Sequence, residues 1–139
     1  MPENTATPTL LVINRWLVII LAVLMVVTAA LAGNGLFKRG SDPWLITGHQ
    51  HLGNLIFFVA IAQVAICYAL YSQARLRGSV MLTSIGVLIL TIAQFGLGYA
   101  TRENLVNIVG WHIAVGVGLT AVVGVLITQL WQQSAPPKG

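Results

Sequence analysis

Charged residues divide the chain into four long uncharged runs, and these runs dominate its hydrophobic pattern. The first run, from Trp16 to Phe37, has 22 residues, and as a helix it would measure about 33 Å at roughly 1.5 Å per residue. That length spans a hydrocarbon core of about 30 Å and exceeds the apolar core of a signal peptide, so we expect it to be retained. Because lipid offers backbone groups no partner, each run is predicted to be helical. The predicted transmembrane helices are Asn14 to Leu36, Leu45 to Ser72, Gly78 to Ala100 and Leu105 to Gln132.

Short polar connections, at residues 38–43, 73–77 and 101–104, separate the predicted helices. Connections of this length make consecutive helices antiparallel neighbours and leave no room for a domain outside the membrane. The sequence therefore predicts an all-α fold, a four-helix transmembrane bundle that forms a single domain over residues 1–139.

The composition agrees with lipid as the solvent, since 57% of the residues are hydrophobic and only 7% are charged. The net charge of +4 does not indicate binding to nucleic acid, because the basic residues stand singly or in pairs between apolar runs, as membrane anchors do. We expect the partners to be the lipid bilayer and other membrane subunits. The single cysteine, Cys67, has no partner for an intrachain disulfide, and the lack of a C-x-x-C-H motif excludes a covalently bound c-type haem.

The basic residues also bear on orientation. Arg15, Arg75, Arg77 and Lys138 would share one side of the membrane with both termini, whereas Lys38, Arg39 and Arg102 would lie on the other. Positive charge is enriched on the cytoplasmic side, so this distribution favours cytoplasmic termini by a small margin. We expect a multi-pass protein of the cytoplasmic (inner) membrane.

The two halves of the chain form an internal repeat. A shift of 63 residues, without a gap, aligns seven identical pairs between residues 28 and 53 and their mates. The pairs are Thr28/Thr91, Ala30/Ala93, Gly33/Gly96, Gly35/Gly98, Arg39/Arg102, His49/His112 and Gly53/Gly116. The repeat units, about 14–72 and 78–132, are therefore interpreted as duplicated helical hairpins that cross the bilayer in the same sense. This symmetry places His49 and His112 at one depth and allows them to face each other.

A symmetric pair of intramembrane histidines suggests a cofactor site. Polar side chains are costly in a bilayer, and neutral imidazole is a common axial ligand of haem iron. The pattern His-x-x-x-Gly occurs twice, and a glycine one turn from each ligand, Gly53 or Gly116, would leave space for a flat macrocycle. Glycines 33, 35, 96 and 98, on the first and third helices, could clear its edges. Close helix packing is an equally open interpretation of these glycines.

Other residues at this depth could contribute. Gln94 could hydrogen-bond a ligating histidine or a pigment carbonyl, and Arg39 and Arg102 could pair with haem propionates or anchor the chain at the interface. His51 lies roughly 200° around its helix from His49, so the two cannot both point at the bundle axis. We keep His51 as the alternative metal ligand.

The His-x-x-x-Gly motifs that open the second and fourth helices resemble one half of the heme A synthase family, and the resemblance covers nearly the whole chain. It implies that His49 and His112 are axial ligands of a haem near the outer face of the membrane. In that family a Glu lies three residues before the first of these histidines and an Arg follows it, where this chain has Ile46 and Gln50.

The sequence pattern is compatible with three functions. The leading hypothesis is a haem b protein, an iron-binding subunit for electron transport or an accessory subunit of a membrane complex. The second is a structural subunit of a respiratory or photosynthetic complex that binds chlorophyll or no cofactor. The third, a haem-modifying enzyme, is less favoured because the spans contain no carboxylate to handle protons; only Asp42 and Glu103, in loops, could do so.

Overall fold

The computed structural model describes residues 9–38, 41–101 and 106–133. In these residues it contains four helices and no strand: α1 (Thr9–Phe37), α2 (Pro43–Ser72), α3 (Gly78–Ala100) and α4 (Val106–Gln132). All four are long and apolar enough to cross a membrane, which makes the chain a multi-pass membrane protein. The predicted all-α four-helix bundle is thus confirmed. The main difference is that α1 begins at Thr9 and not at Asn14.

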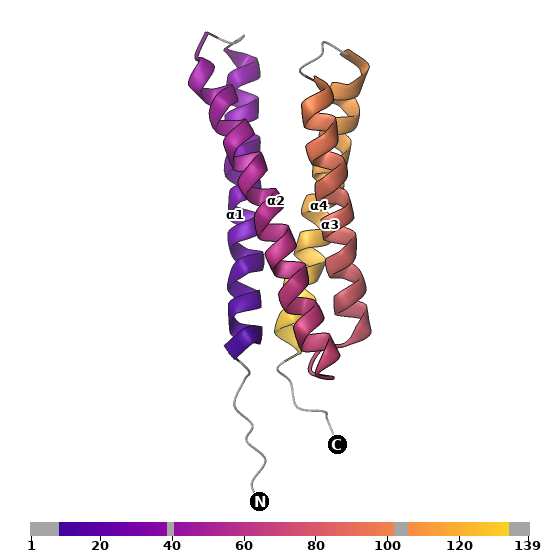
Figure 1. Ribbon diagram of the computed structural model, residues 1–139. Coiled ribbons are helices and arrows are strands. Elements are labelled where there is room, and N and C mark those ends of the chain that lie inside the picture. The colour runs from indigo at the N-terminus through magenta and orange to yellow at the C-terminus, as the bar shows by residue number, and fades with distance from the viewer. Residues whose placement is uncertain (1–8, 39–40, 102–105, 134–139) are drawn as a thin grey trace, which may run out of the picture.

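The helices form two antiparallel hairpins, α1/α2 and α3/α4 (Figure 1). Each helix packs against two others, in the ring order α1, α2, α3, α4 and back to α1. Over the described residues, the diagonal pairs α1/α3 and α2/α4 have no close backbone approach. Figure 1 shows the hairpins separated at the end that carries the α1–α2 and α3–α4 connections, while α2 inclines towards α3 at the opposite end.

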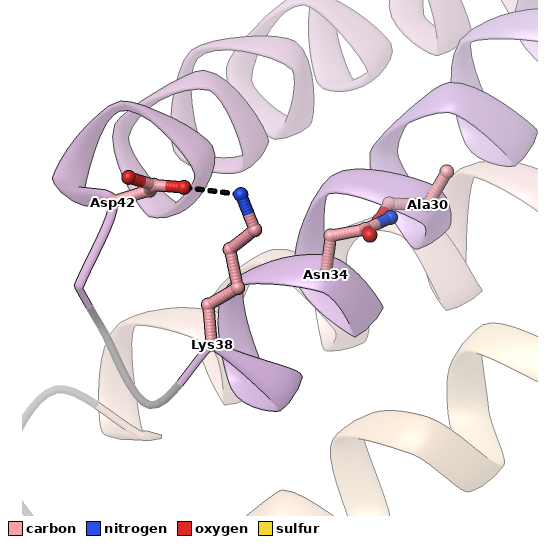
Figure 2. Close-up of polar contacts among 4 residues, drawn as sticks. All are labelled: Ala30, Asn34, Lys38 and Asp42. Atoms are coloured by element: carbon pink, nitrogen blue, oxygen red, sulfur yellow. Dashed lines mark hydrogen bonds and ion pairs between the residues drawn. The ribbon is translucent and has the colours of Figure 1, made fainter.

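Local sequence explains how α2 begins and how it ends. Pro43 opens α2, where its missing N–H costs nothing, and Asp42 just before it pairs with Lys38 from the end of α1 (Figure 2). At the other end of α2, Ala74 adopts a left-handed φ of 56°. The Ala74 N–H donates to the Tyr71 carbonyl and the Arg75 N–H to the Leu70 carbonyl, both at 2.9 Å, which is a Schellman motif.

The apolar core fills mainly the half of the bundle that holds the start of α1, the end of α4 and the α2–α3 connection. Its buried side chains there are Leu11, Val18, Leu21, Ala60, Cys67, Leu70, Leu76, Val80, Val87, Val123, Leu126 and Leu130. Since this half is closely packed, it fixes how the two hairpins meet. The other half is left more open.

A buried polar cluster lies within the packed half and links three helices. Ser84 of α3 donates a hydrogen bond to Gln63 Oε1 of α2 at 2.8 Å. Asn14 of α1 and Gln63 both donate to the sulfur of Cys67, at 3.0 and 3.1 Å. These four side chains are 0% exposed. Because a polar group in lipid needs a partner, the cluster sets the rotation of α1, α2 and α3 about one another.

Arg15 joins α1 to α4 at the same end of the bundle. Its Nε and Nη2 donate to the Leu130 carbonyl at 3.1 and 3.0 Å, and its guanidinium lies 5.4 Å from the ring centre of Trp131. A cation near the last carbonyls of a helix is favourable, because these groups carry partial negative charge and lack helical partners. This contact closes the ring of helices.

Candidate cofactor site

The open half of the bundle contains a cavity of about 410 Å³ that is lined by residues from all four helices. Its wall is mainly apolar, with a few polar side chains among small and aromatic ones. Sites for small molecules and cofactors commonly have volumes of about 300–1,000 Å³ and this kind of lining. The cavity is therefore the candidate functional site in the described part of the chain.

His49 of α2 and His112 of α4 face each other inside this cavity. They belong to diagonal helices, yet their ring centres are 6.1 Å apart, with the ring planes at 74°. Two imidazoles that bind one metal ion from opposite sides, through bonds of about 2.0–2.1 Å, would place their ring centres roughly 6.3 Å apart. The structure thus brings the two repeat-related histidines close together.

The ring of His49 is oriented by the backbone of α1. Its Nδ1 lies 2.9 Å from the Thr28 carbonyl oxygen. A carbonyl only accepts, so Nδ1 carries the proton and Nε2 keeps its lone pair. Metal-binding histidines are commonly held in this way, with one ring nitrogen donating to a carbonyl and the other left for the metal. Nε2 of His49 is therefore left without a partner among the described residues.

His112 is held differently. Its Nε2 lies 3.2 Å from the side-chain nitrogen of Gln94 on α3. An amide NH₂ group only donates, so Nε2 accepts and Nδ1 carries the proton. Gln94 therefore contacts the ring nitrogen that would otherwise be available to a metal. Gln94 thus lies at the depth of His112, and the ring nitrogen that it contacts is Nε2.

Three polar atoms on the cavity wall are buried and have no hydrogen-bond partner in the described structure: Thr28 Oγ1, Gln94 Oε1 and His112 Nδ1. Buried polar atoms are nearly always paired in native proteins. These three atoms are therefore unsatisfied within the described structure.

The glycines around the cavity have two roles. A Cβ on Gly98 would lie 3.2 Å from His112 Cε1, and one on Gly116 would lie 3.1 Å from the Gln94 amide nitrogen, so these two glycines make room for the Gln94–His112 pair. Gly33 and Gly53 also line the cavity, but a Cβ on either would meet nothing within 4 Å. They border open space that an occupant could use.

Two glycines with predicted roles lie elsewhere. Gly96 is exposed and is not part of the cavity wall, because it lies roughly 200° around α3 from both Gln94 and Gly98. Gly35 allows α1 to approach Leu45 and Ile46 of α2 closely. Of the glycines on α1 and α3, only Gly33 and Gly98 line the cavity.

The other predicted site residues are not brought to the cavity. His51, the alternative ligand, is exposed and absent from the cavity wall. Arg39, Arg102 and Glu103 lie outside the described residues. Asp42 is engaged with Lys38 at the α1–α2 turn, as Figure 2 shows, and does not line the cavity.

The cavity wall also contains residues that the sequence did not indicate as site residues. They are Gln50, Asn54, Phe95, Tyr99 and Thr28, whose backbone carbonyl contacts His49. A signal for some of them was present. Thr28 belongs to an identical repeat pair, and Gln50 and Asn54 are amides four residues apart, hence on one helix face, within an apolar run.

No three potential metal ligands of the His, Cys, Asp or Glu type are grouped anywhere in the described residues. Two facing imidazoles alone are a sparse donor set for a bare ion. They suit a metal whose remaining ligands come from a macrocycle.

Comparisons with family models, with curated proteins and with solved structures give no match to this chain.

Proposed function

We propose that the protein binds haem b between His49 and His112 and serves a membrane complex as an electron-transfer or accessory subunit. The observation that carries this proposal is the facing pair of imidazoles, 6.1 Å apart, inside an apolar cavity. Haem would supply one-electron redox chemistry at this position. Since the chain has no C-x-x-C-H motif, the haem would be held without a covalent link.

The surrounding residues support a macrocycle. His49 is already oriented by the Thr28 carbonyl, so its Nε2 needs no further change before it can bind a metal. Open space beside Gly33 and Gly53 offers room for flat edges, and the apolar wall would exclude water from them. His112 would become the second ligand once its Nε2 exchanges Gln94 for the metal.

Electron transfer is favoured over haem modification by the composition of the wall. Among the described residues that line the cavity there is no Asp, Glu, Lys or Arg. An oxidative change of the macrocycle needs a group that accepts or delivers protons close to the reacting carbon. Two imidazole ligands and an apolar wall instead favour repeated electron exchange without substrate chemistry.

The setting of the proposed subunit follows from the charge distribution. Cytoplasmic termini and a location in the cytoplasmic membrane place the histidine pair towards the outer face. The exposed aromatic side chains Trp16, Trp44, Trp111 and Trp131 suit the two membrane interfaces, and other membrane subunits would cover part of the apolar surface.

A chlorophyll-type pigment is the second candidate, and one observation favours it. Of the two histidines in the cavity, only His49 has a ring nitrogen that is both unprotonated and without a described partner, because Nε2 of His112 is taken by Gln94. Chlorophyll magnesium normally takes a single axial ligand. A structural or pigment-binding subunit of a photosynthetic complex would use the site in this way.

Optical spectroscopy of the purified protein tests the proposal. We expect a low-spin b-type spectrum with a sharp α band on reduction, and its loss in His49→Ala and in His112→Ala. His51→Ala is the matched control, because this third histidine is exposed and outside the cavity. Organic extraction distinguishes haem from chlorophyll. A folded protein that stays colourless after reconstitution with either pigment would overturn both candidates.

A further inference from the structure

The two lateral edges of the cavity are related by the internal repeat, but they have diverged in chemistry. One edge lies between α2 and α3 and the other between α4 and α1. Three repeat pairs line both edges: Gln50 with Ile113, Asn54 with Val117, and Phe95 with Ala32. In every pair the α2/α3 edge carries an amide or an aromatic ring, where the α4/α1 edge carries an aliphatic side chain. Duplication alone would have left the edges alike.

The amides on the α2/α3 edge are available to a ligand. Gln50 and Asn54 are four residues apart, so they lie on the same face of α2. Both are half-buried, and neither has a hydrogen-bond partner among the described residues. An unpaired amide is costly in an apolar setting, which gives a carbonyl-bearing ligand a clear advantage there.

Aromatic rings stand beside these amides. Phe57 and Phe95 stack with ring centres 5.0 Å apart and planes at 27°. The ring centres of Phe95 and Tyr99 are 4.8 Å apart. Phe95 and Tyr99 line the cavity, and Tyr99 is 45% exposed, so it stands at the opening of the cavity to its surroundings. A flat ring that enters at this edge would pack on aromatic faces.

We infer that this edge of the same cavity binds a lipid-soluble ring that bears carbonyl groups, of the quinone class. The NH₂ groups of Gln50 and Asn54 would donate to its carbonyl oxygens, while Phe95 and Tyr99 would pack against the ring. Access from the bilayer requires a ligand that dissolves in lipid, since the edge belongs to membrane-spanning helices. The inference extends the haem proposal but does not depend on it, because the amides and rings form the edge with or without a macrocycle.

Equilibrium binding to the purified full-length protein in nanodiscs tests this inference. The probes are a 1,4-benzoquinone and a 1,4-naphthoquinone that carry a short alkyl chain. The ligand control is an alkylbenzene with the same chain and no carbonyl. We expect saturable binding of at least one quinone and only partition of the alkylbenzene.

A matched pair of double variants locates the site. Gln50→Leu combined with Asn54→Leu is expected to weaken quinone binding about tenfold or more, equivalent to about 1.4 kcal/mol. Ile113→Leu combined with Val117→Leu, at the repeat-equivalent positions, should leave binding unchanged. Circular dichroism checks that both variants fold. In the wild type, the side-chain amide NMR signals of Gln50 and Asn54 should shift with quinone.

Several results would overturn the inference: equal binding of quinone and alkylbenzene, equal loss in the two double variants, or no loss in either. A change in the visible circular dichroism of the haem-loaded Gln50/Asn54 variant, with quinone binding intact, would show that these amides orient a macrocycle. Failure to bind haem would leave the quinone result unaffected, so the two proposals fail separately.

Discussion

The side-chain nitrogen of Gln94 lies 3.2 Å from Nε2 of His112, and this contact breaks the symmetry of the duplicated site. The repeat mate of Gln94 is Leu31, which has no polar group to offer His49. His49 is instead held through Nδ1 by the Thr28 carbonyl, at 2.9 Å. Two histidines that the repeat makes equivalent are therefore restrained through opposite ring nitrogens. Nε2 of His49 has no partner among the described residues, whereas Nε2 of His112 contacts Gln94.

Replacing Gln94 with Leu should release His112. A net hydrogen bond is worth about 1 kcal/mol, so its loss should raise haem affinity roughly fivefold when Nε2 no longer needs to leave a partner. In the protein without haem, ¹⁵N spectra of labelled histidine, of which the chain has three, should show a change at His112 alone. Gln73→Leu is the control, since Gln73 is exposed and lies outside the cavity wall. Lower haem affinity in Gln94→Leu would instead mean that Gln94 supports the bound state.

Filling the open space beside Gly53 should block the cofactor without harming the bundle. A Cβ at this position meets nothing within 4 Å, and the residue lines the cavity. Gly53→Leu is therefore expected to lower haem or pigment retention more than tenfold while the free energy of unfolding stays the same or rises, because leucine favours a helix more than glycine does. Pigment content and unfolding in mixed micelles are the measurements.

Gly86→Leu provides the comparison for this variant. Gly86 also has open space where a Cβ would lie, but it is outside the cavity wall. This variant should retain pigment at the wild-type level. Equal loss of pigment in both variants would contradict the assigned position of the macrocycle.

The buried cluster around Gln63 should contribute measurably to stability. Gln63→Leu removes the acceptor of the Ser84 hydroxyl and a donor to Cys67 in the core. We expect the free energy of unfolding to fall by about 1–2 kcal/mol in mixed micelles. Thr128→Val is the control, because its hydroxyl bonds only the Gly124 carbonyl of its own helix and is exposed. If the two variants were equally stable, the cluster would not tie the helices together.

Ala74 offers a stabilising change. Its left-handed φ of 56° is unfavourable for a residue with a Cβ, whereas glycine is the usual residue at this place in a Schellman motif. Ala74→Gly should raise the free energy of unfolding by about 0.5–1 kcal/mol. The same change in mid-helix, Ala62→Gly, should lower it by about 0.5–1 kcal/mol. Opposite signs are the diagnostic result, and a loss in both variants would argue against the left-handed turn.

The sequence by itself determined the helices and their order. Lipid leaves the backbone no alternative to helix, so the length of each apolar run was sufficient to predict four spans. The repeat then placed His49 and His112 at one depth without any knowledge of packing. The sequence places the start of α1 at Asn14, whereas the helix begins at Thr9 and so includes the residues before Asn14. Arg15 lies inside the helix, where its guanidinium binds the Leu130 carbonyl.

Only the tertiary structure decided how the side chains are used. Whether Gly96 or Gly98 faces the cavity depends on the rotation of α3, which the buried contact between Ser84 and Gln63 helps to fix. Which nitrogen of His112 is engaged depends on the distance from α3 to α4. Neither the rotation of α3 nor its distance from α4 can be read from the sequence, because both depend on contacts between different helices. The repeat determined where the histidines lie, and helix packing determined which nitrogen of each ring is engaged: Nδ1 of His49 by the Thr28 carbonyl and Nε2 of His112 by Gln94.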